Sequence, residues 1–259
     1  MESGVSLSSM ERQEQLLLFL EQHERATVDE LSQRFDVSVA TVRRDLESLQ
    51  AQGLIQRFHG GAKIARQAPP ELPALNRREE HADEKQRIGR AAAGLIEDGD
   101  TVFLGSGTTV LDVARHLHGH RGLSVISNSL LVQNELSKTA AITVIGLGGI
   151  LRHSEMSMIG HITEQALAEV RAQKTIIGIR AIDVEHGLTN DYVPETMTDR
   201  AILAQPGQTI IVADHSKCAR VSTVWLAPIS SVDTLVTDDK APPEFVDALA
   251  AHNIKVLTV

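Results

Sequence analysis

The sequence predicts an α/β protein in which a small N-terminal winged helix-turn-helix precedes a larger, mostly parallel α/β domain. A capped pair of short amphipathic helices at residues 27–51 runs into a Gly-Gly hairpin. From about residue 83, short β-branched runs alternate with helical patterns, which is typical of a parallel sheet covered on both faces. With 259 residues, the chain has room for one small and one larger domain. We expect a winged helix-turn-helix at residues 1–65, a linker at 66–82 and a second domain at 83–259.

The N-terminal domain is expected to begin with an amphipathic helix at residues 11–23. Thr27 predicts the N-cap of a second helix, and Glu30, three residues later, completes a capping box. Apolar residues at helical spacing then define the buried side of both helices. These inward residues are Leu16, Leu17 and Leu20 in the first helix and Val28, Leu31 and Phe35 in the second.

A tight turn at Asp36 and Val37 leads to a third helix, which Ser38 caps and in which Val42, Leu46 and Leu49 form the buried stripe. This stripe turns small, hydroxyl and arginine side chains outward near the helix N-terminus. In a helix-turn-helix, this is the part that meets base edges and phosphates. The alternative is an ordinary exposed helix with charges of both signs, since Asp45 and Glu47 sit beside the arginines. The absence of an acid at the leading end favours DNA binding.

Gly53 is expected to end this helix, and the segment LIQRFHGGA predicts a strand and a Gly-Gly turn, the form of a wing. Arg57 and His59 of this wing would face the phosphate backbone. The predicted contacts with double-stranded DNA are Thr27, Ser38, Ala40, Thr41, Arg43, Arg44, Arg57 and His59.

Positive charge is concentrated on this predicted DNA surface. Residues 1–67 carry 8 basic against 10 acidic residues, a net charge of −2, and the rest carries 17 against 24, a net charge of −7. Residues 41–66 carry 5 against 2, a local charge of +3. We therefore expect affinity to depend on base contacts and on two heads acting together. Aromatic residues make up 3% of the chain, so stacking on single-stranded nucleic acid is not expected.

The sequence has the features of a cytoplasmic protein, nucleoid-associated when bound to DNA. It holds no apolar run long enough to cross a membrane, and its first residues lack the pattern of a secretion signal. A single cysteine, Cys218, permits no internal disulfide and is expected to be an incidental thiol.

A charged stretch with three prolines at residues 66–81 predicts the linker. The elements expected after it are a helix at 85–97, a strand at 101–105, a helix at 110–117, a strand at 123–127, a helix at 129–138, a strand at 141–149, a helix at 160–172, a strand at 174–179, a helix at 194–203, and strands at 209–214, 231–238 and 254–259.

The loop Gly105-Ser106-Gly107-Thr108-Thr109, between a strand and a helix, is a candidate phosphate site. Ligands of open α/β sheets sit beyond the carboxyl ends of the strands. Glycines let the backbone approach an anion, hydroxyls donate to it, and the helix N-terminus adds its dipole. The alternative is a plain strand-to-helix turn, because the loop is neither a Walker loop nor a dinucleotide fingerprint.

Polar residues also follow the other strands. An amide can bond a sugar hydroxyl, a Gly pair permits close backbone approach, Asp191 and Glu195 can bind hydroxyls, and a lysine offers an ammonium to a phosphate. Each alone is more often a cap or a turn, but together at one sheet edge they favour a small polyhydroxy anion. The predicted effector contacts are Gly105, Ser106, Gly107, Thr108, Thr109, Asn128, Gly148, Gly149, Arg180, Glu195 and Lys217.

Two other patterns carry less weight. His116, His118 and His120 alternate as in a strand-borne metal site, but they cross a helix end, so a solvated surface is expected. Asp238-Asp239 is interpreted as an acidic turn before Ala-Pro-Pro. The sequence predicts no catalytic residue, metal site or cofactor.

The segment VSVATVRRDLESLQAQGLIQRFHGGA resembles the head of the DeoR/GlpR family of bacterial sugar-metabolism regulators. The segments DEKQRIGRAAAGLIEDGDTVFLGSGTT, SNS, GLGGIL, GLT and ADHSK resemble its effector domain, so the resemblance covers essentially the whole chain after residue 10. It implies a fold similar to ribose-5-phosphate isomerase and coenzyme A transferases. It also implies a phosphorylated sugar as effector, with its phosphate near residues 105–109 and with Asn128, Glu195 and Lys217 close by.

The chain departs from this family at residues 178–182, which read Gly-Ile-Arg-Ala-Ile where many members have Gly-Ala-Asp-Gly-Ile. Arg180 would therefore add a contact to an acidic or second phosphate group, or pair with Asp183.

We expect a transcriptional repressor of a carbohydrate catabolic operon, a dimer or tetramer on paired operator half-sites, released by a phosphorylated sugar. One rival is an isomerase-like or acyl-transfer enzyme with a DNA-binding appendage, in which Glu195 acts as a base beside Lys217. A metabolic enzyme, however, has no evident use for such a head. An activator or a nucleoid-associated protein is the other rival. The acidic total disfavours nucleoid binding, whereas the sign of regulation depends on the operator position.

Overall fold

The chain divides into two compact units, Met1–Pro70 and Glu71–Val259, which we call the N-terminal unit and the α/β unit. The computed structural model describes residues 9–23, 25–51, 55–58, 60–64 and 73–259. The boundary between the units falls inside the predicted linker. Residues 73–82 belong to the α/β unit, where the backbone N–H of Ala74 donates to the carbonyl of Ser154 at 2.7 Å.

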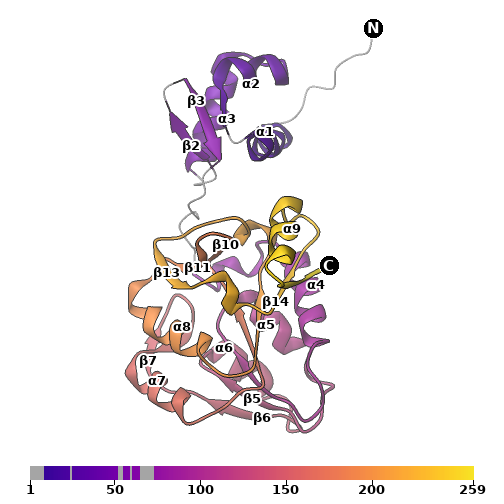
Figure 1. Ribbon diagram of the computed structural model, residues 1–259, viewed down its shortest axis with the longest axis vertical. Helices are drawn as coiled ribbons and strands as arrows, with labels where there is room; N and C mark the ends of the chain where they lie inside the picture. The colour runs from indigo at the N-terminus through magenta and orange to yellow at the C-terminus, as the bar shows by residue number, and fades with distance from the viewer. Residues whose placement is uncertain (1–8, 24, 52–54, 59, 65–72) are drawn as a thin grey trace. The chain divides into compact units, whose positions relative to one another are not determined.

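Among its described residues, the N-terminal unit has the winged helix-turn-helix arrangement that the sequence predicts (Figure 1). The strands are antiparallel in the order β1-β3-β2, and Phe58 pairs with Gly61 across the wing. The elements are α1 (Ser9–His23), β1 (Arg25–Thr27), α2 (Val28–Phe35), α3 (Val39–Ala51), β2 (Ile55–Phe58) and β3 (Gly61–Ile64). Strand β1 is the element that the sequence did not predict.

Local hydrogen bonds fix the helix-turn-helix. The Thr27 hydroxyl accepts from the Glu30 backbone N–H at 3.2 Å, and the Glu30 carboxylate accepts from the Thr27 backbone N–H at 2.7 Å, which confirms the capping box. Asp36 ends α2 in the left-handed conformation, with φ 49°. The Ser38 hydroxyl then accepts from the Thr41 N–H at 3.1 Å, which confirms the second cap.

The predicted inward residues form the core of this unit. All are buried or pack against the buried set, and Ile55 and Ala62 of the wing join them. The core consists of Leu16, Leu20, Ala26, Val28, Leu31, Val42, Leu46, Leu49, Ile55 and Ala62, with Leu17 and Phe35 partly buried against it. Gly53, which was predicted to end α3, lies outside the described residues.

Contrary to the expectation from the sequence, Asp45 does not lie beside the arginines on the solvent face of α3. It lies three residues after Val42, on the buried side of α3, and its side chain is 3% exposed. Its carboxylate accepts from Arg12 Nε at 2.6 Å and from Gln13 Nε2 at 3.1 Å, so it ties α3 to α1. Burial opposes ionisation, but these hydrogen bonds outweigh burial and lower the pKa of Asp45.

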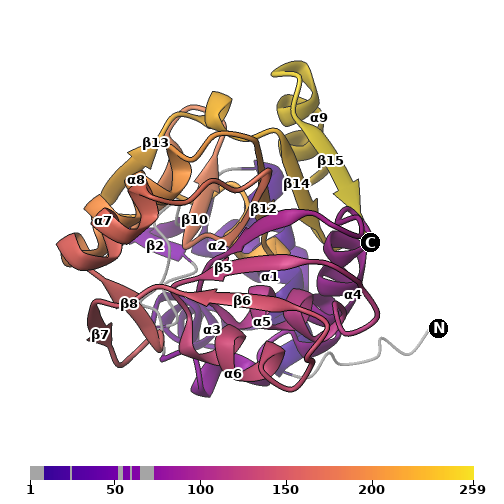
Figure 2. The same ribbon diagram turned by 90° about the horizontal axis from the view of Figure 1, so that it is seen from below.

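The α/β unit is built on a seven-stranded parallel sheet in the order β15-β14-β12-β9-β4-β5-β6 (Figure 2). Strand β4 lies between β9 and β5, so the loop that follows β4 lies between the ends of these two strands. The strands are β4 (Thr101–Leu104), β5 (Ser124–Ser127), β6 (Thr143–Gly146), β9 (Lys174–Gly178), β12 (Gln208–Val212), β14 (Thr234–Thr237) and β15 (Lys255–Thr258).

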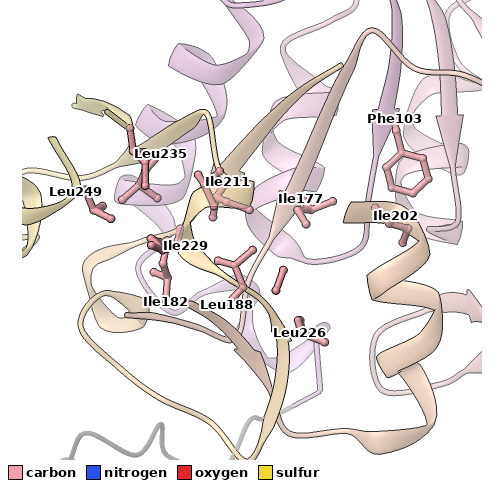
Figure 3. Close-up of a cluster of buried hydrophobic side chains, with 14 of the residues drawn as sticks. Phe103, Ile177, Ile182, Leu188, Ile202, Ile211, Leu226, Ile229, Leu235 and Leu249 are labelled. Atoms are coloured by element: carbon pink, nitrogen blue, oxygen red, sulfur yellow. The ribbon is translucent and has the colours of Figure 1, made fainter. Parts of the chain in front are cut away.

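Both faces of this sheet are covered, as the short apolar strands predict. Along β4, Val102 and Leu104 pack into one core, whereas Phe103 packs into the other. The first core contains side chains of α4 (Ala82–Ala93), α5 (Thr108–Arg115) and α6 (Leu130–Leu136). The second contains side chains of α7 (His161–Ala168), α8 (Thr196–Leu203) and α9 (Pro243–Ala251) (Figure 3).

Several short elements of this unit do not follow from the sequence pattern. They are the hairpin β7 (Ile150–Arg152) and β8 (Ser157–Ile159), the antiparallel sheet of β10 (Ala181–Asp183), β11 (Gly187–Asn190) and β13 (Val224–Ala227), helix α9, and the 3-10 turns η1 (Asn76–Arg78), η2 (Val193–Glu195), η3 (His215–Lys217) and η4 (Ile229–Ser231). The strands have three or four residues each, too few to show alternation. Pro242 and Pro243 suggest a turn, yet proline also suits the first position of a helix, as in α9.

No helix among the described residues combines the length and the apolar character that a membrane span requires.

We expect Asp45→Ala to lower the free energy of unfolding of the N-terminal unit by about 1.5–3 kcal/mol, because it removes a buried carboxylate and its charge-assisted hydrogen bonds with α1. Urea unfolding followed by circular dichroism measures this. The matched control is Glu47→Ala, which removes the exposed pair with Arg57 and should cost less than about 1 kcal/mol. Equal losses in the two variants would contradict the role given to Asp45.

Candidate DNA interface and effector site

The leading end of α3 presents the residues that were predicted to read DNA. Ala40, Arg43 and Arg44 are exposed, and Thr41 is partly exposed. Because Asp45 is buried and paired with Arg12, the first exposed acid along this helix is Glu47. The exposed surface of the first two turns is therefore more positive than the sequence count indicates. This surface suits base edges and phosphates.

The hydroxyls of the two caps are already engaged within the protein. The Thr27 hydroxyl accepts from the Glu30 N–H and also donates to the Glu30 carboxylate at 2.9 Å. The Ser38 hydroxyl lies 2.9 Å from that of Thr41. Their predicted DNA contacts stay predictions, and their visible role is to position the helices.

The wing is joined to both helices of the motif. The N–H of Val28, the first residue of α2, donates to the carbonyl of Gly60 in the wing turn at 2.9 Å. Arg57 Nη1 lies 3.2 Å from Glu47 Oε1, so a phosphate that binds Arg57 would compete with a carboxylate of α3. His59, which was also predicted to face DNA, lies outside the described residues.

The structure brings the predicted effector residues to the carboxyl edge of the parallel sheet. The segments after β12, β9, β4, β5 and β6 leave neighbouring strands at the same edge. Glu195 reaches this region from η2 through Ser157 of β8, which forms a bridge to Ser129 beyond β5. The effector roles of these residues stay predictions.

The loop after β4 is held close to its neighbour β9, because the N–H of Gly105 donates to the carbonyl of Ile176 at 3.0 Å. Gly107 is the N-cap of α5, and its φ of 109° is a conformation that favours glycine. No side chain caps α5 by a hydrogen bond, among the residues that the structure describes. The N–H groups that begin α5 are thus arranged as at helix N-termini that bind anions.

Asn128 is buried, and one end of its amide is committed. Its Nδ2 donates to the carbonyl of Met158 in β8 at 3.0 Å. Its Oδ1 is also buried and accepts no hydrogen bond from any described residue. An unsatisfied buried acceptor costs about 1–3 kcal/mol, so this oxygen is suited to a donor such as a sugar hydroxyl.

The Gly148-Gly149 pair contacts the protein's own chain. The carbonyl of Gly148 accepts from the Thr163 hydroxyl at 2.7 Å. A Cβ at Gly149 would lie 2.1 Å from that hydroxyl oxygen and 2.8 Å from the Ile159 carbonyl oxygen. The absence of a side chain at Gly149 therefore allows β8 and α7 to pack closely against it. These contacts do not bear on the predicted approach of an effector, which stays a prediction.

Glu195 lies in a buried polar cluster rather than on an open surface. Its carboxylate pairs with the Arg152 guanidinium and accepts from the Ser157 hydroxyl at 3.2 Å. Burial raises the pKa of Glu195 despite Arg152. Burial and the nearby charge of Glu195 also raise the pKa of Asp199, to which Asn190 donates at 2.6 Å. A neutral hydroxyl suits this cluster better than a second anion.

Arg180 does not pair with Asp183, which was one of its two expected roles. Its Nε donates to Asp191 at 2.9 Å, and its side chain is buried. Asp183 instead accepts from the backbone N–H of Glu185 and His186, which closes the turn between β10 and β11. Asp183 is the acid nearest to Arg180 in the sequence, but its carboxylate is engaged in this turn. The sequence did not predict the turn.

Lys217 lies in η3 after β12, and its charge acts on a second lysine, Lys85 of α4. Lys85 is buried, and its ammonium donates to the carbonyl of Arg77 at 2.7 Å. Burial lowers the pKa of Lys85, the charge of Asp214 opposes this, and the charges of Arg77 and Lys217 add to it. Arg77 in turn pairs with Glu155 at 2.6 Å. Lys85 therefore holds the backbone of η1, and Lys217 is the lysine that follows a strand of the sheet.

Asp238 begins the acidic turn that the sequence predicts, since the Lys240 backbone N–H donates to its carboxylate at 3.0 Å, but its side chain is not on the surface. It is fully buried after β14 and accepts from the His215 backbone N–H at 2.7 Å and from His215 Nδ1 at 2.9 Å. Burial opposes ionisation of Asp238, but the hydrogen bonds from His215 lower its pKa to about 2. Burial also opposes the charged form of His215, yet its bond to Asp238 outweighs this and raises the pKa of His215. The pair fixes the segment that carries Lys217.

The three alternating histidines take separate partners. His116 Nδ1 lies 2.7 Å from the carbonyl oxygen of Asp112, His118 contacts Thr139 and Glu135, and His120 Nε2 lies 3.1 Å from the carbonyl oxygen of Ile96. The lone thiol, Cys218, is buried, and burial raises its pKa to about 12.

Comparison with protein families matches both units. Residues 12–68 match the "DeoR-like helix-turn-helix domain", and residues 80–239 match the "DeoR C terminal sensor domain". The chain belongs to the DeoR family of transcriptional regulators. The α/β unit is thus the sensor domain of a DeoR-family regulator, and the N-terminal unit is its DNA-binding domain.

Relatives match this DeoR-family chain over nearly its whole length. The transcriptional repressor AccR of Agrobacterium fabrum is 35% identical over 89% of this chain and 90% of its own. The glycerol-3-phosphate regulon repressor of Escherichia coli is 33% identical over 96% and 99%. The repressor GlcR of Bacillus subtilis is 34% identical over 95% of both. These relatives are named as repressors, which agrees with the expectation of a regulator and not with the isomerase-like or acyl-transfer rival.

Solved structures give weaker matches. Ribose 5-phosphate isomerase A from Methanocaldococcus jannaschii aligns with a TM-score of 0.38 and 17% identity over 53% of this chain and 55% of its own. The protein eIF2B beta from Chaetomium thermophilum aligns with a TM-score of 0.42 and 17% identity over 86% and 70%.

Sequence reasoning missed the charged partners that surround the predicted sensor residues. Lys85 stands in the charged run DEKQR, where a lysine normally faces solvent. Arg152 is 43 positions from Glu195 and belongs to an unpredicted hairpin, and Asn190 and Asp199 come from two further elements. No spacing signal marks such a cluster, because it forms only when separate loops meet.

We expect Arg43→Ala and Arg44→Ala each to weaken operator binding about 10-fold or more, because one arginine contact with a base or phosphate contributes roughly 1–3 kcal/mol. Titration of an operator duplex, selected from a random library with the unmodified chain, measures this. Arg90→Ala, an exposed arginine of α4 in the other unit, is the matched control. Unchanged affinity in both α3 variants would show that α3 does not read DNA.

We expect Asp238→Asn to lower the free energy of unfolding by about 2 kcal/mol, the value that corresponds to the shift in the Asp238 pKa from 3.8 to about 2. The lowered pKa of Asp238 stabilises the fold above pH 3.8, and this is lost as the pH falls towards 2. The raised pKa of His215 stabilises the folded state below pH 6.5, and this stabilisation is lost as the pH rises above 6.5. Urea unfolding should show the largest difference between about pH 4 and 6.5. A pH-independent difference would exclude the ion pair as its cause.

Proposed function

We propose that this DeoR-family regulator represses a carbohydrate catabolic operon in the cytoplasm and is released from its operator by a phosphorylated sugar. It binds operator DNA as a homo-oligomer, a dimer or tetramer, with one winged helix-turn-helix on each half-site. The observation that carries this proposal is that an uncapped helix N-terminus, Lys217 and a buried unsatisfied acceptor all follow strands at one sheet edge.

The phosphate is assigned to the loop Gly105–Thr109. The backbone N–H groups that begin α5 and the hydroxyls of Ser106, Thr108 and Thr109 are its donors. Lys217 supplies the opposing charge from the end of β12. A dianionic phosphate attracts this ammonium group, whereas an uncharged sugar does not.

The carbon chain of the sugar then extends towards the ends of β5 and β6. Asn128 Oδ1 accepts from one hydroxyl, and Glu195 accepts from another while Arg152 holds its carboxylate in place. Arg180, which pairs with Asp191, is the position at which this chain selects an acidic group over a neutral one. The name of one relative, a glycerol-3-phosphate regulon repressor, supports a phosphorylated polyol or sugar as the class.

Release from DNA requires the sugar phosphate to bind the DNA-incompetent state more tightly than the competent one. A swing from 1:99 to 99:1 needs a difference of about 5.5 kcal/mol. Charge-assisted hydrogen bonds to a phosphate contribute about 1.5–3 kcal/mol each, so two or three that form in one state alone are sufficient. Activation rather than repression would use the same site, since the sign follows from the operator position.

A thermal-shift screen of the full chain against sugar phosphates, free sugars and coenzyme A esters tests the effector class. We expect a saturable rise in melting temperature with one or two phosphates, because a ligand that binds only the folded state must stabilise it. No shift with any phosphate, or a shift with free sugars or coenzyme A esters instead, would contradict the phosphate assignment.

We expect Lys217→Ala and Thr108→Val to reduce the affinity for the active phosphate at least about 10-fold, since each removes a hydrogen bond to an anion. Both variants should still bind operator DNA and should no longer be released by that phosphate. Lys138→Ala, an exposed lysine paired with Glu135 after α6, is the matched control. Normal release of both variants would place the effector elsewhere.

A further inference from the structure

Exposed apolar side chains collect along one side of the sensor domain. They come from β7, α7, the start of η2, α8 and β13, of which α7, α8 and β13 lie side by side in both ribbon views (Figures 1 and 2). The set consists of Ile150, Ile162, Tyr192, Val193, Met197 and Trp225, which we call the apolar face. It includes the only tryptophan and the only tyrosine of the chain.

Two arginines connect this face into one surface. The Arg200 guanidinium lies 5.4 Å from the centre of the Trp225 ring and donates to the Trp225 carbonyl at 2.7 Å. Arg200 follows Met197 by three residues, so both lie on the same side of α8. The Arg152 guanidinium lies 4.2 Å from the centre of the Tyr192 ring, which joins β7 to η2. Such arginine–aromatic pairs are enriched at protein interfaces.

The face carries no exposed acid, although the unit that bears it is acidic. Residues 71–259 have 17 basic against 24 acidic residues, a net charge of −7. Within β7, α7, η2, α8 and β13, no exposed residue is Asp or Glu, because Glu195 is buried and Glu164 and Asp199 are only partly exposed. Exposed acids occur at the margin, at Glu169 and Asp191. An apolar centre with a charged rim is the arrangement of protein interfaces.

We propose that the apolar face is the surface through which two copies of this chain associate. Two acidic sensor domains repel each other least where neither presents an acid. A standard interface buries about 800 Å² per partner, and six exposed apolar side chains can form the centre of such an interface. A two-fold arrangement places Trp225 and Met197 of one copy against the same face of its partner. This inference deepens the proposed homo-oligomer on paired half-sites.

The apolar face also adjoins the candidate effector site. Arg152 contacts Tyr192 of the face and pairs with Glu195 of the site. An effector that binds Glu195 therefore acts on Arg152, which contacts Tyr192. This contact offers a route from the bound sugar to the proposed contact between two sensor domains.

The test is sedimentation of the full chain and of a Val193→Asp/Met197→Asp variant over micromolar concentrations. These two side chains are 68% and 61% exposed, so the substitutions do not disturb the core. An acid buried without a partner at an interface is costly, so we expect the dissociation constant to rise at least about 100-fold. The variant should contain half as many copies as the unmodified chain, or fewer. Persistence of the original assembly would overturn the proposal.

Trp225 gives a second measurement that needs no disruptive variant. Because it is the only tryptophan, the fluorescence emission of the unmodified chain should shift to shorter wavelength as the chain associates and the ring becomes buried. Unchanged emission across a concentration range in which sedimentation detects association would overturn the proposal. A chain that stays monomeric throughout would overturn it as well.

The matched control is Ile145→Asp on the edge strand β6, outside the apolar face. This side chain is 37% exposed, and edge strands tolerate charge, so the assembly should not change. Sugar-phosphate binding and operator binding are measured on the same proteins. If the unmodified chain associates through this face but binds no sugar phosphate, the effector proposal fails while the interface stands.

Discussion

The burial of one parallel sheet on both faces is the constraint from which the rest of the sensor domain follows. Helices α4 to α6 cover one face, and α7 to α9 with the small antiparallel sheet cover the other, so a ligand reaches the sheet only at its ends. The carboxyl ends of five neighbouring strands meet at one edge, and polar residues concentrate there. Because a closed core excludes water, each polar group at that edge must find a partner within the protein or in a ligand.

Most polar groups at this edge are held by other parts of the protein, which makes the site rigid. Glu195 is held by Arg152, Arg180 holds Asp191, and His215 binds Asp238, each across different elements. Such buried pairs contribute little net stability relative to apolar packing, but they fix the positions of charged groups. The Oδ1 atom of Asn128 is an exception among the described residues, and a buried acceptor of this kind is where a ligand gains most from a hydrogen bond.

The two units use the same physical device in different ways. In the N-terminal unit, the buried Asp45 ties α3 to α1 and removes an acid from the surface that meets DNA. In the sensor domain, burial of Glu195 and partial burial of Asp199 remove acids from the face that we propose to bind a second copy. In both places an acid that the sequence counts as surface charge is turned inward, so the working surface is less negative than its composition. The electrostatic repulsion between this acidic protein and DNA, or a second copy of the protein, is thereby reduced at these two surfaces.

The sequence alone determined the helix-turn-helix, its caps and core, the succession of the parallel strands along the chain and the residues at their ends. These depend on local spacing and on the rule that parallel strands end at one edge. Only the tertiary structure decided the partners of those residues. The pairing of Arg180 with Asp191 rather than Asp183, the burial of Asp45 and Asp238, and the place of Lys85 depend on contacts between distant segments. Short strands and charged runs carry no periodic signal, so the elements that bring these segments together were missed.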